Sequence, residues 1–292
     1  MDLVIDTNCL NSPRLRTFLG ESATNRAVLT HETAVESFRG DIPDGIIQSW
    51  SVLRDFPNQT VMLKGPRLIA PLDCTSPGMV RAMICKGQTS GAKKFAGFLD
   101  EAAAGNPAII AQLKIRYGWS AEHADRMVAE FVPASDQIAD MVREFTPDEM
   151  RRIRKLQDFS DETAEKIFRI VDSIAATTIY HGPIKIKPPK HRHRVNHFIW
   201  RRALVHVSYL LSLIERGATQ RADNKVRNDS MDAMLATYAT YFGGIMTGDQ
   251  LAETLHIEAR NVLVALGARV PRDRVLETPG APLRPNDNAQ TC

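Results

Sequence analysis

Four acidic residues of this 292-residue chain stand where short apolar segments, predicted to be strands, run into predicted helices. They are Asp6, Glu36, Asp232 and Asp249, and they are far apart in the sequence. In open α/β sheets, ligands bind outside the carboxyl ends of the strands, where residues distant in sequence converge. Carboxylates gathered there would form an oxygen-rich pocket suited to Mg²⁺ or Mn²⁺. The pattern therefore predicts metal-dependent chemistry on a phosphate.

Each acid taken alone has a simpler explanation. Asp6 and Asp249 both occupy positions typical of a helix N-cap. Asp232 could be a first-turn acid that faces the helix dipole, and Glu36 could lie on a solvated helix face. Together the four acids favour the metal site, because like charges placed close together cost stability unless a cation joins them.

Two further acids bear on the site. Asp229 precedes Asp232 by three residues, so the two share a helix face, and Asp229 is a candidate ligand for a second ion. Glu32 lies one helical turn before Glu36 and competes with it for the same role.

The elements that must position these acids follow an α/β pattern. Segments 2–8, 27–29 and 61–63 read as buried strands, separated by predicted helices over 14–20, 30–39 and 46–56. Such β-α-β-α-β order is typical of a parallel sheet. The pattern resumes near the C-terminus, with predicted helices over 198–216 and 228–242, a strand over 244–247 and a helix over 249–266.

The middle of the chain interrupts this pattern. Residues 66–197 are predicted to be mostly helical and poor in strands. We therefore expect a discontinuous core, made of residues 1–65 and 198–268, that carries a helical insertion over 66–197. The proline-rich tail, 270–292, is expected to be flexible.

A basic segment, 181–202, closes the insertion and contains no acid. A block of this kind is typical of a surface that binds a polyanion. Its histidines fit no structural zinc pattern, so a metal site in this segment is a weaker alternative. A plain solvated surface is the other alternative. Tyr180, Phe198 and Trp200 could stack on bases, although Phe198 fits better in the core. The basic residues expected to contact nucleic-acid phosphates are Lys185, Lys187, Lys190, Arg192, Arg194, Arg201 and Arg202.

Four short motifs resemble those of PIN-domain ribonucleases, and they occur in the order found in that family. They are Leu3–Asn8, Thr33–Gly40, Asp232–Ala236 and Ile245–Asp249. The resemblance covers about residues 1–65 and 198–268 and does not extend to the middle of the chain.

The resemblance implies a three-layer α/β/α sandwich and Mg²⁺- or Mn²⁺-dependent cleavage of RNA. Asp6, Glu36, Asp232 and Asp249 would hold the metal, and Thr7 or Asn8, with Thr247, would orient carboxylates or the phosphate. It also implies a bacterial toxin, or a stress or defence effector, restrained by an inhibitory partner protein. The sequence leaves open a structure-specific DNA nuclease, a non-catalytic nucleic-acid-binding protein, and whether the chain forms homo-oligomers.

Bulk properties agree with a globular protein. The chain is 43% hydrophobic and 24% charged, with a net charge of +3. No apolar run approaches the ~18 residues that a membrane span requires. No secretory signal is recognisable, and the four cysteines match neither a zinc site nor a disulfide framework, so we expect a cytoplasmic protein with free thiols.

Overall fold

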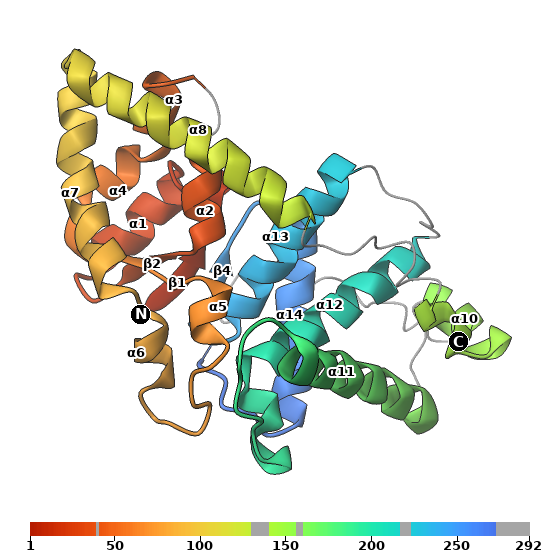
Figure 1. Cartoon of the computed structure of the whole chain (residues 1–292). Helices are drawn as coiled ribbons and strands as arrows, with labels where there is room; N and C mark the ends of the chain where they lie inside the picture. The colour runs from red at the N-terminus through yellow and green to blue at the C-terminus, as the bar shows by residue number, and fades with distance from the viewer. Residues whose placement is uncertain (39–40, 130–139, 156–159, 217–222, 273–292) are drawn as a thin grey trace, which may run out of the picture.

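A parallel sheet of four strands forms the centre of the described structure. The computed structural model describes residues 1–38, 41–129, 140–155, 160–216 and 223–272 (Figure 1). The strands are β1 (Asp2–Ile5), β2 (Arg26–Leu29), β3 (Thr60–Met62) and β4 (Ile245–Met246), in the order β3-β2-β1-β4. Val4 of β1 aligns with Val28 of β2 and with Ile245 of β4. The predicted parallel α/β sheet is therefore confirmed.

Successive side chains of a strand point to opposite faces, and both faces of this sheet are buried. On one face, Leu3, Ile5 and Leu29 contribute to a core with the helices that follow the first strands. These helices are α1 (Pro13–Glu21), α3 (Asp44–Ser49), α4 (Ser51–Asp55), α7 (Lys86–Ala103) and α8 (Pro107–Ala129).

On the other face, Val4 and Val28 contribute to a larger core. The helices that supply it are α5 (Pro66–Ile69), α6 (Met79–Met83), α10 (Pro147–Arg154), α11 (Asp161–His181), α12 (Phe198–Glu215), α13 (Asp223–Ala239) and α14 (Gln250–Ala265). The helix α2 (His31–Glu36) and the 3₁₀ turns η1 (Thr7–Cys9), η2 (Pro57–Gln59) and η3 (His191–Asn196) complete the described elements.

Several expected elements differ in extent, and two of these differences have a clear local cause. The first strand ends at Ile5, because the Asp6 side chain caps η1 by accepting the Thr7 N–H. The helix expected over 46–56 is divided at Trp50, whose backbone leaves helical geometry. The Trp50 indole donates to Ser37 Oγ at 3.0 Å, which holds the ring against the helix α2 segment.

The middle of the chain does not stand apart from the core. Leu63, just after β3, forms an antiparallel bridge with Ile84, and α7 then lies along β3. Phe95 of α7 packs edge-on against Trp50, with ring centroids 4.9 Å apart. The segment expected to be an insertion therefore supplies part of one layer, and α11 supplies part of the other by packing along α12.

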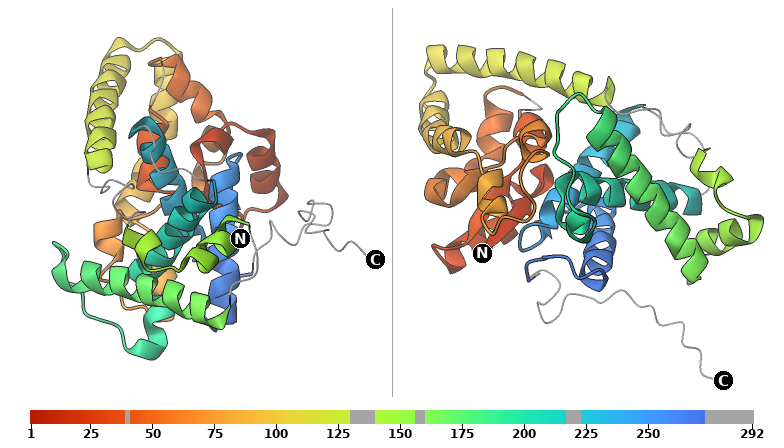
Figure 2. Two further views of the ribbon diagram at one scale, coloured as in Figure 1. Left: turned by 90° about the vertical axis from the view of Figure 1, so that its right-hand side faces the viewer. Right: turned by 60° about the horizontal axis from the view of Figure 1, so that its bottom comes forward.

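Helix α8 links two parts of the molecule that carry predicted site residues. It runs from the α7 side across to α13, and it contacts both α2 and α13 (Figures 1 and 2). Among the described helices, none has the length and apolar character needed to cross a membrane. Arg39, Gly40 and the tail from residue 273 onward lie outside the described residues.

Candidate metal centre

The four predicted acids come together at the carboxyl edge of the sheet. Asp6 follows β1 and Asp249 follows the neighbouring strand β4, while Glu36 ends α2 and Asp232 lies on α13. The pKa of Asp232 is raised to about 8, first by burial and then by the negative charges of Asp249, Asp6, Asp229 and Glu36. Asp232 therefore lies within electrostatic reach of the other three predicted acids.

Asp6 lies at the centre of the hydrogen bonding. It is buried, with 5% of its surface exposed. Its Oδ1 accepts from the Thr7 N–H at 2.6 Å, and its Oδ2 accepts from the Thr247 hydroxyl at 2.6 Å. Burial raises the pKa of Asp6, these hydrogen bonds lower it, and the charges of Glu36 and Asp249 raise it further. Both bonds fix the direction in which this carboxylate points.

Thr247 joins Asp6 to Asp249. Its Oγ1 accepts the Asp249 N–H at 2.8 Å while its hydroxyl proton goes to Asp6. Asp249 is also the N-cap of α14, because its Oδ1 accepts the Leu251 N–H at 2.6 Å. The capping explanation is therefore correct for Asp249. The cap uses only Oδ1, and the side chain is exposed at the edge of the site.

Glu36, and not Glu32, belongs to this group of acids. The Thr7 hydroxyl donates to Glu36 Oε2 at 2.9 Å, which brings α2 and the end of β1 together. Glu32 is buried, with 2% of its surface exposed, and its charge acts on Tyr238 of α13. The two residues therefore point to different surroundings, one to the acid edge and one to the interior.

Asn8 has a supporting position rather than a place among the acids. Its Oδ1 accepts the Gly248 N–H at 3.0 Å, which ties the loop after β1 to the loop after β4. Because Gly248 stands between Thr247 and Asp249, this bond helps to hold both residues in place.

Sequence reasoning missed Tyr209 of α12. Its hydroxyl donates to Asp229 Oδ2 at 2.9 Å within the protein interior. Asp229 is buried, with 8% of its surface exposed, and it adds negative charge beside Asp232. A tyrosine hydroxyl on a mostly buried helix, which needs a hydrogen-bond partner, was the available signal.

The chemistry of these donors fits a hard divalent cation, although no direct ligand set is preformed. Within the part of the chain that the structure describes, no group of three or more His, Cys, Asp or Glu side chains is arranged to hold a metal ion. Mg²⁺ usually keeps several waters and uses one or two carboxylates with substrate phosphates, so a complete protein cage is not required. The clustered charge that raises the Asp232 pKa is the feature that a cation would neutralise.

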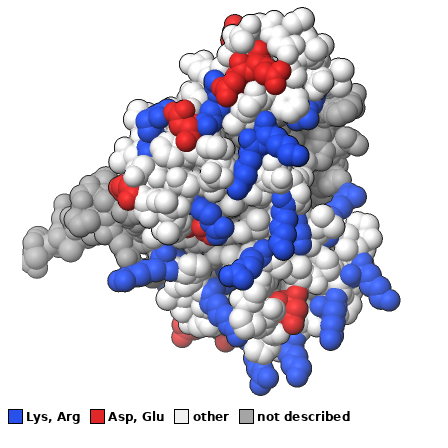
Figure 3. Space-filling model, turned by 90° about the vertical axis from the view of Figure 1, so that its left-hand side faces the viewer, with Lys and Arg blue, Asp and Glu red and all other residues white. Residues whose placement is uncertain are grey.

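The basic segment lies at the opposite end of the sheet from these acids. The Tyr241 hydroxyl donates to the Asn196 carbonyl at 3.0 Å, and Tyr241 stands shortly before β4 begins. The segment thus adjoins the amino ends of the strands. Lys185, Lys187, Lys190 and Arg192 are exposed there, and Lys and Arg side chains gather on one face of the molecule (Figure 3).

The structure contradicts one of the predicted phosphate contacts in this segment, that of Arg201, and places Arg194 and Arg202 in partly exposed positions. Arg201 is buried, with 1% of its surface exposed, and its donors are used inside the protein. Arg194 pairs with Asp172 at 3.0 Å. Arg202 is only partly exposed, and its charge acts on His206. The helix expected over 198–216 is present as α12, but the sequence did not show that Arg201 lies on its buried side.

The aromatic residues near the segment also differ in their exposure. Tyr180 has 66% of its surface exposed, so it is available for stacking. Trp200 is buried and donates to Asp172 Oδ1 at 2.7 Å, which contradicts a stacking role. Phe198 is fully buried in the core, as the alternative explanation expected.

Comparison with known proteins adds no relative: no family model matches the chain, and neither a curated protein nor a solved structure is similar to it.

Proposed function

We propose that this protein is a Mg²⁺- or Mn²⁺-dependent nuclease of the PIN type that hydrolyses RNA phosphodiester bonds. The observation that carries the proposal is the mutual electrostatic effect of Asp6, Asp232 and Asp249, which lie in distant parts of the chain. Two of these acids also cap helical turns, but gathering their charges with that of Asp232 costs stability unless a cation compensates them. The four sequence motifs that resemble the PIN family include all of these residues.

Asp6, Asp232 and Asp249 would hold the cation, and Glu36 would complete the negative surroundings. When bound, a divalent ion neutralises phosphate charge and activates water for attack on phosphorus. Thr247 orients Asp6, and Thr7 orients Glu36, through the hydrogen bonds described above. Without a cation Asp232 keeps its proton at neutral pH, because its pKa is about 8, so cation binding is expected to release that proton.

The exposed lysines of the basic segment would bind RNA away from the acids. Contacts between lysines and phosphates give affinity without base preference, and they weaken as salt rises. An RNA that reaches both regions must pass along the side of the molecule, because the two lie at opposite ends of the sheet. We further propose a toxin or defence setting with a restraining partner protein, which rests on the resemblance alone.

Cleavage assays with purified protein test this function. The protein is expected to cut RNA in Mg²⁺ or Mn²⁺ and not in EDTA, and Asp6→Asn and Asp232→Asn should each abolish cutting. Asp140→Asn, a change at an exposed acid outside the site, is the matched control and should retain activity. Faster cutting of a matched DNA would make DNA the substrate. Salt-sensitive RNA binding without cleavage, or full activity in both variants, would overturn the catalytic assignment.

A further inference from the structure

A cavity of ≈ 400 Å³ lies beside the turn between α13 and β4, away from the acids. Its walls come from four parts of the chain: the segment around α6, the end of η3 with α12, the turn after α13, and the segment after α14. Asp232 and the end of α13 are separated by seven residues, or about 10 Å along the helix axis. The cavity is therefore separate from the candidate metal centre, and its volume falls within the range of small-molecule sites.

Arg201, whose side chain is buried, is one of the residues that line the cavity. Its Nε donates to the Val195 carbonyl at 3.1 Å, and one terminal nitrogen donates to the Thr240 carbonyl at 2.7 Å and to the Thr240 hydroxyl oxygen at 3.2 Å. The other terminal nitrogen donates to the Arg269 carbonyl at 2.8 Å and to Asn196 Oδ1 at 3.3 Å. The guanidinium carbon also lies 4.0 Å from the centre of the Tyr241 ring. Every one of these partners is neutral.

Arg201 thus holds a positive charge in the interior, and the acceptors of its five hydrogen bonds are all neutral groups. Burial lowers its pKa, which measures the cost of keeping the charge away from water. A buried charge without a counter-ion is strongly unfavourable, and an apolar side chain of similar size would avoid the cost. Because these bonds use all of its donors, an anion in the cavity would interact with the Arg201 charge through space and not through a new hydrogen bond to it.

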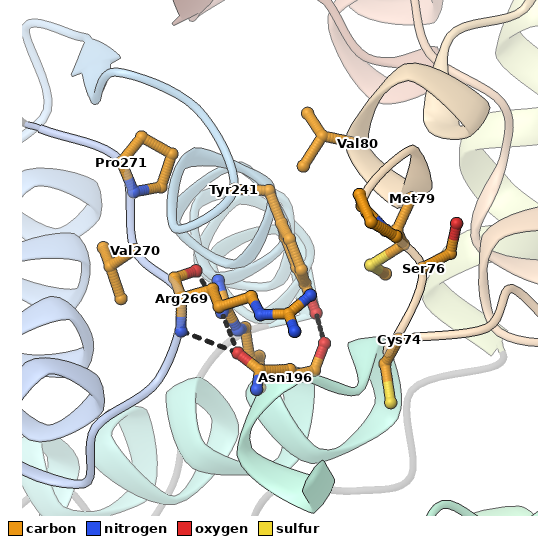
Figure 4. A pocket seen from close by; sticks show the side chains of 11 residues that line it. Cys74, Ser76, Met79, Val80, Asn196, Tyr241, Arg269, Val270 and Pro271 are labelled. Carbon is orange, nitrogen blue, oxygen red and sulfur yellow. Dashed lines mark hydrogen bonds between the residues drawn. The ribbon is translucent and has the colours of Figure 1, made fainter.

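A second guanidinium, that of Arg269, lines the same cavity (Figure 4). One of its nitrogens donates to the Thr75 carbonyl at 3.1 Å, and its backbone N–H donates to Asn196 Oδ1 at 2.8 Å. Ser76 Oγ accepts the Gly78 N–H at 3.2 Å, which leaves its hydroxyl proton for a ligand. No Asp or Glu is among the residues that line the cavity in the described part of the chain.

The remaining walls are apolar. Met79 and Val80 stand on one side, and Val270 and Pro271 stand on the other (Figure 4). Guanidinium groups recognise carboxylates and phosphates through paired hydrogen bonds, and apolar walls favour a hydrocarbon or aromatic body. We infer that this cavity binds a small organic anion, with its carboxylate or phosphate toward Arg269 and the Arg201 side and its apolar body between Met79 and Val270.

Binding to the full chain tests the inference directly, without any need for nuclease activity. Phenyl phosphate, benzoate and inorganic phosphate are titrated by calorimetry in EDTA, with neutral benzyl alcohol as the uncharged probe. We expect saturable binding of phenyl phosphate or benzoate, and at least tenfold weaker binding of benzyl alcohol. The tighter of the two aromatic anions identifies the preferred head group, and weaker binding of inorganic phosphate reports the contribution of the apolar walls.

Variants then locate the site. Arg269→Gln keeps the backbone bond to Asn196 and should weaken binding at least tenfold, as should Val270→Asp, which puts a negative charge in the wall. Lys114→Gln removes an exposed charge outside the cavity and should leave binding unchanged. Arg201→Met is measured only if its thermal melt is cooperative, since this buried residue also holds three segments together. Absence of saturable binding, or equal binding by wild type and Arg269→Gln, would overturn the inference.

Discussion

The hydroxyl of Thr247 donates to Asp6 Oδ2 at 2.6 Å, although 241 positions separate the two residues in the chain. Thr247 also accepts the backbone N–H of Asp249. One hydroxyl therefore fixes the relative positions of two acids, the first and the last of the predicted set.

Thr247→Val keeps the shape of this side chain and removes its hydroxyl. We expect cleavage in Mg²⁺ to fall roughly 10- to 100-fold, the usual effect of losing a group that orients a metal ligand. Half-saturation by Mg²⁺ should move to higher concentration. Thr254→Val, which removes a hydroxyl bonded only to the Gln250 carbonyl, is the control. Unchanged activity and Mg²⁺ dependence in Thr247→Val would show that the bond does not serve the site.

Asp232→Asn is expected to stabilise the metal-free protein while abolishing cleavage. The pKa of Asp232 is about 8 in the folded protein, against an ordinary value of 3.8. Below about pH 4 this carboxyl is protonated in both the folded and the unfolded state, so it does not affect the free energy of unfolding. Between pH 4 and pH 8 the free energy of unfolding falls, because the folded protein retains a proton that the unfolded chain releases. In EDTA at pH 8.5 the variant should melt roughly 5 °C higher than wild type. At pH 4 the two should melt together, and a constant difference across this range would contradict the assignment.

In saturating Mg²⁺ the wild type should melt at a higher temperature than Asp232→Asn, the reverse of the order expected in EDTA. A ligand that binds only the folded state stabilises it by about 2.7 kcal/mol at 100 times its dissociation constant. Wild type should therefore melt several degrees higher in saturating Mg²⁺, whereas Asp6→Asn and Asp232→Asn should gain little. Equal gains in wild type and both variants would place the cation elsewhere.

The basic segment should affect RNA binding and not the chemical step. The double variant Lys185→Gln with Lys187→Gln removes two exposed charges at the end of the sheet opposite the acids. We expect a higher KM, a weaker dependence of binding on salt and an unchanged kcat. Lys94→Gln with Lys155→Gln removes two exposed charges elsewhere on the molecule and provides a charge-matched control. A fall in kcat without a change in KM would contradict this division of roles.

His197 should make the protein sensitive to acid. Its Nδ1 accepts the Ile199 N–H at 3.3 Å and caps α12, and burial lowers its pKa to about 4. The unfolded chain then binds the proton more tightly, so stability is complete above about pH 6.5 and falls as the pH drops to 4. The loss should reach about 3 kcal/mol. His197→Asn, which keeps a capping oxygen, should lessen this loss in denaturant titrations at pH 7 and pH 4.5, whereas exposed His191→Asn should not.

The sequence predicted the parallel sheet and the grouping of Asp6, Glu36, Asp232 and Asp249 at its carboxyl edge, because both follow from local signals. Apolar segments that end in Asp6 and Met246 identify buried parallel strands, and topology alone then brings Asp6 and Asp249 to neighbouring positions. The choice of Glu36 over Glu32 was also predicted, and the structure gives the reason in the bond from Thr7.

The parts that the sequence did not predict depend on long-range packing. The inward turn of Arg201 depends on carbonyl groups of Val195, Thr240 and Arg269, which no local pattern brings together. The bond from Tyr209 to Asp229 joins α12 to α13 in the same way. Composition made residues 181–202 look like a uniform basic surface, whereas tertiary structure divides them into an exposed loop and a buried helix.

The shortest strand has a disproportionate influence on the acid edge. β4 contains two residues, and β1 holds it partly through bonds from the Val4 and Asp6 amides to the carbonyls of Gly244 and Met246, each at 3.0 Å. If β4 separates from β1, Thr247 and Asp249 move away from Asp6 while β1, β2 and β3 stay paired. Amide hydrogen exchange at Asp6 therefore reports the fraction of molecules in which the acid edge is assembled, independently of global unfolding.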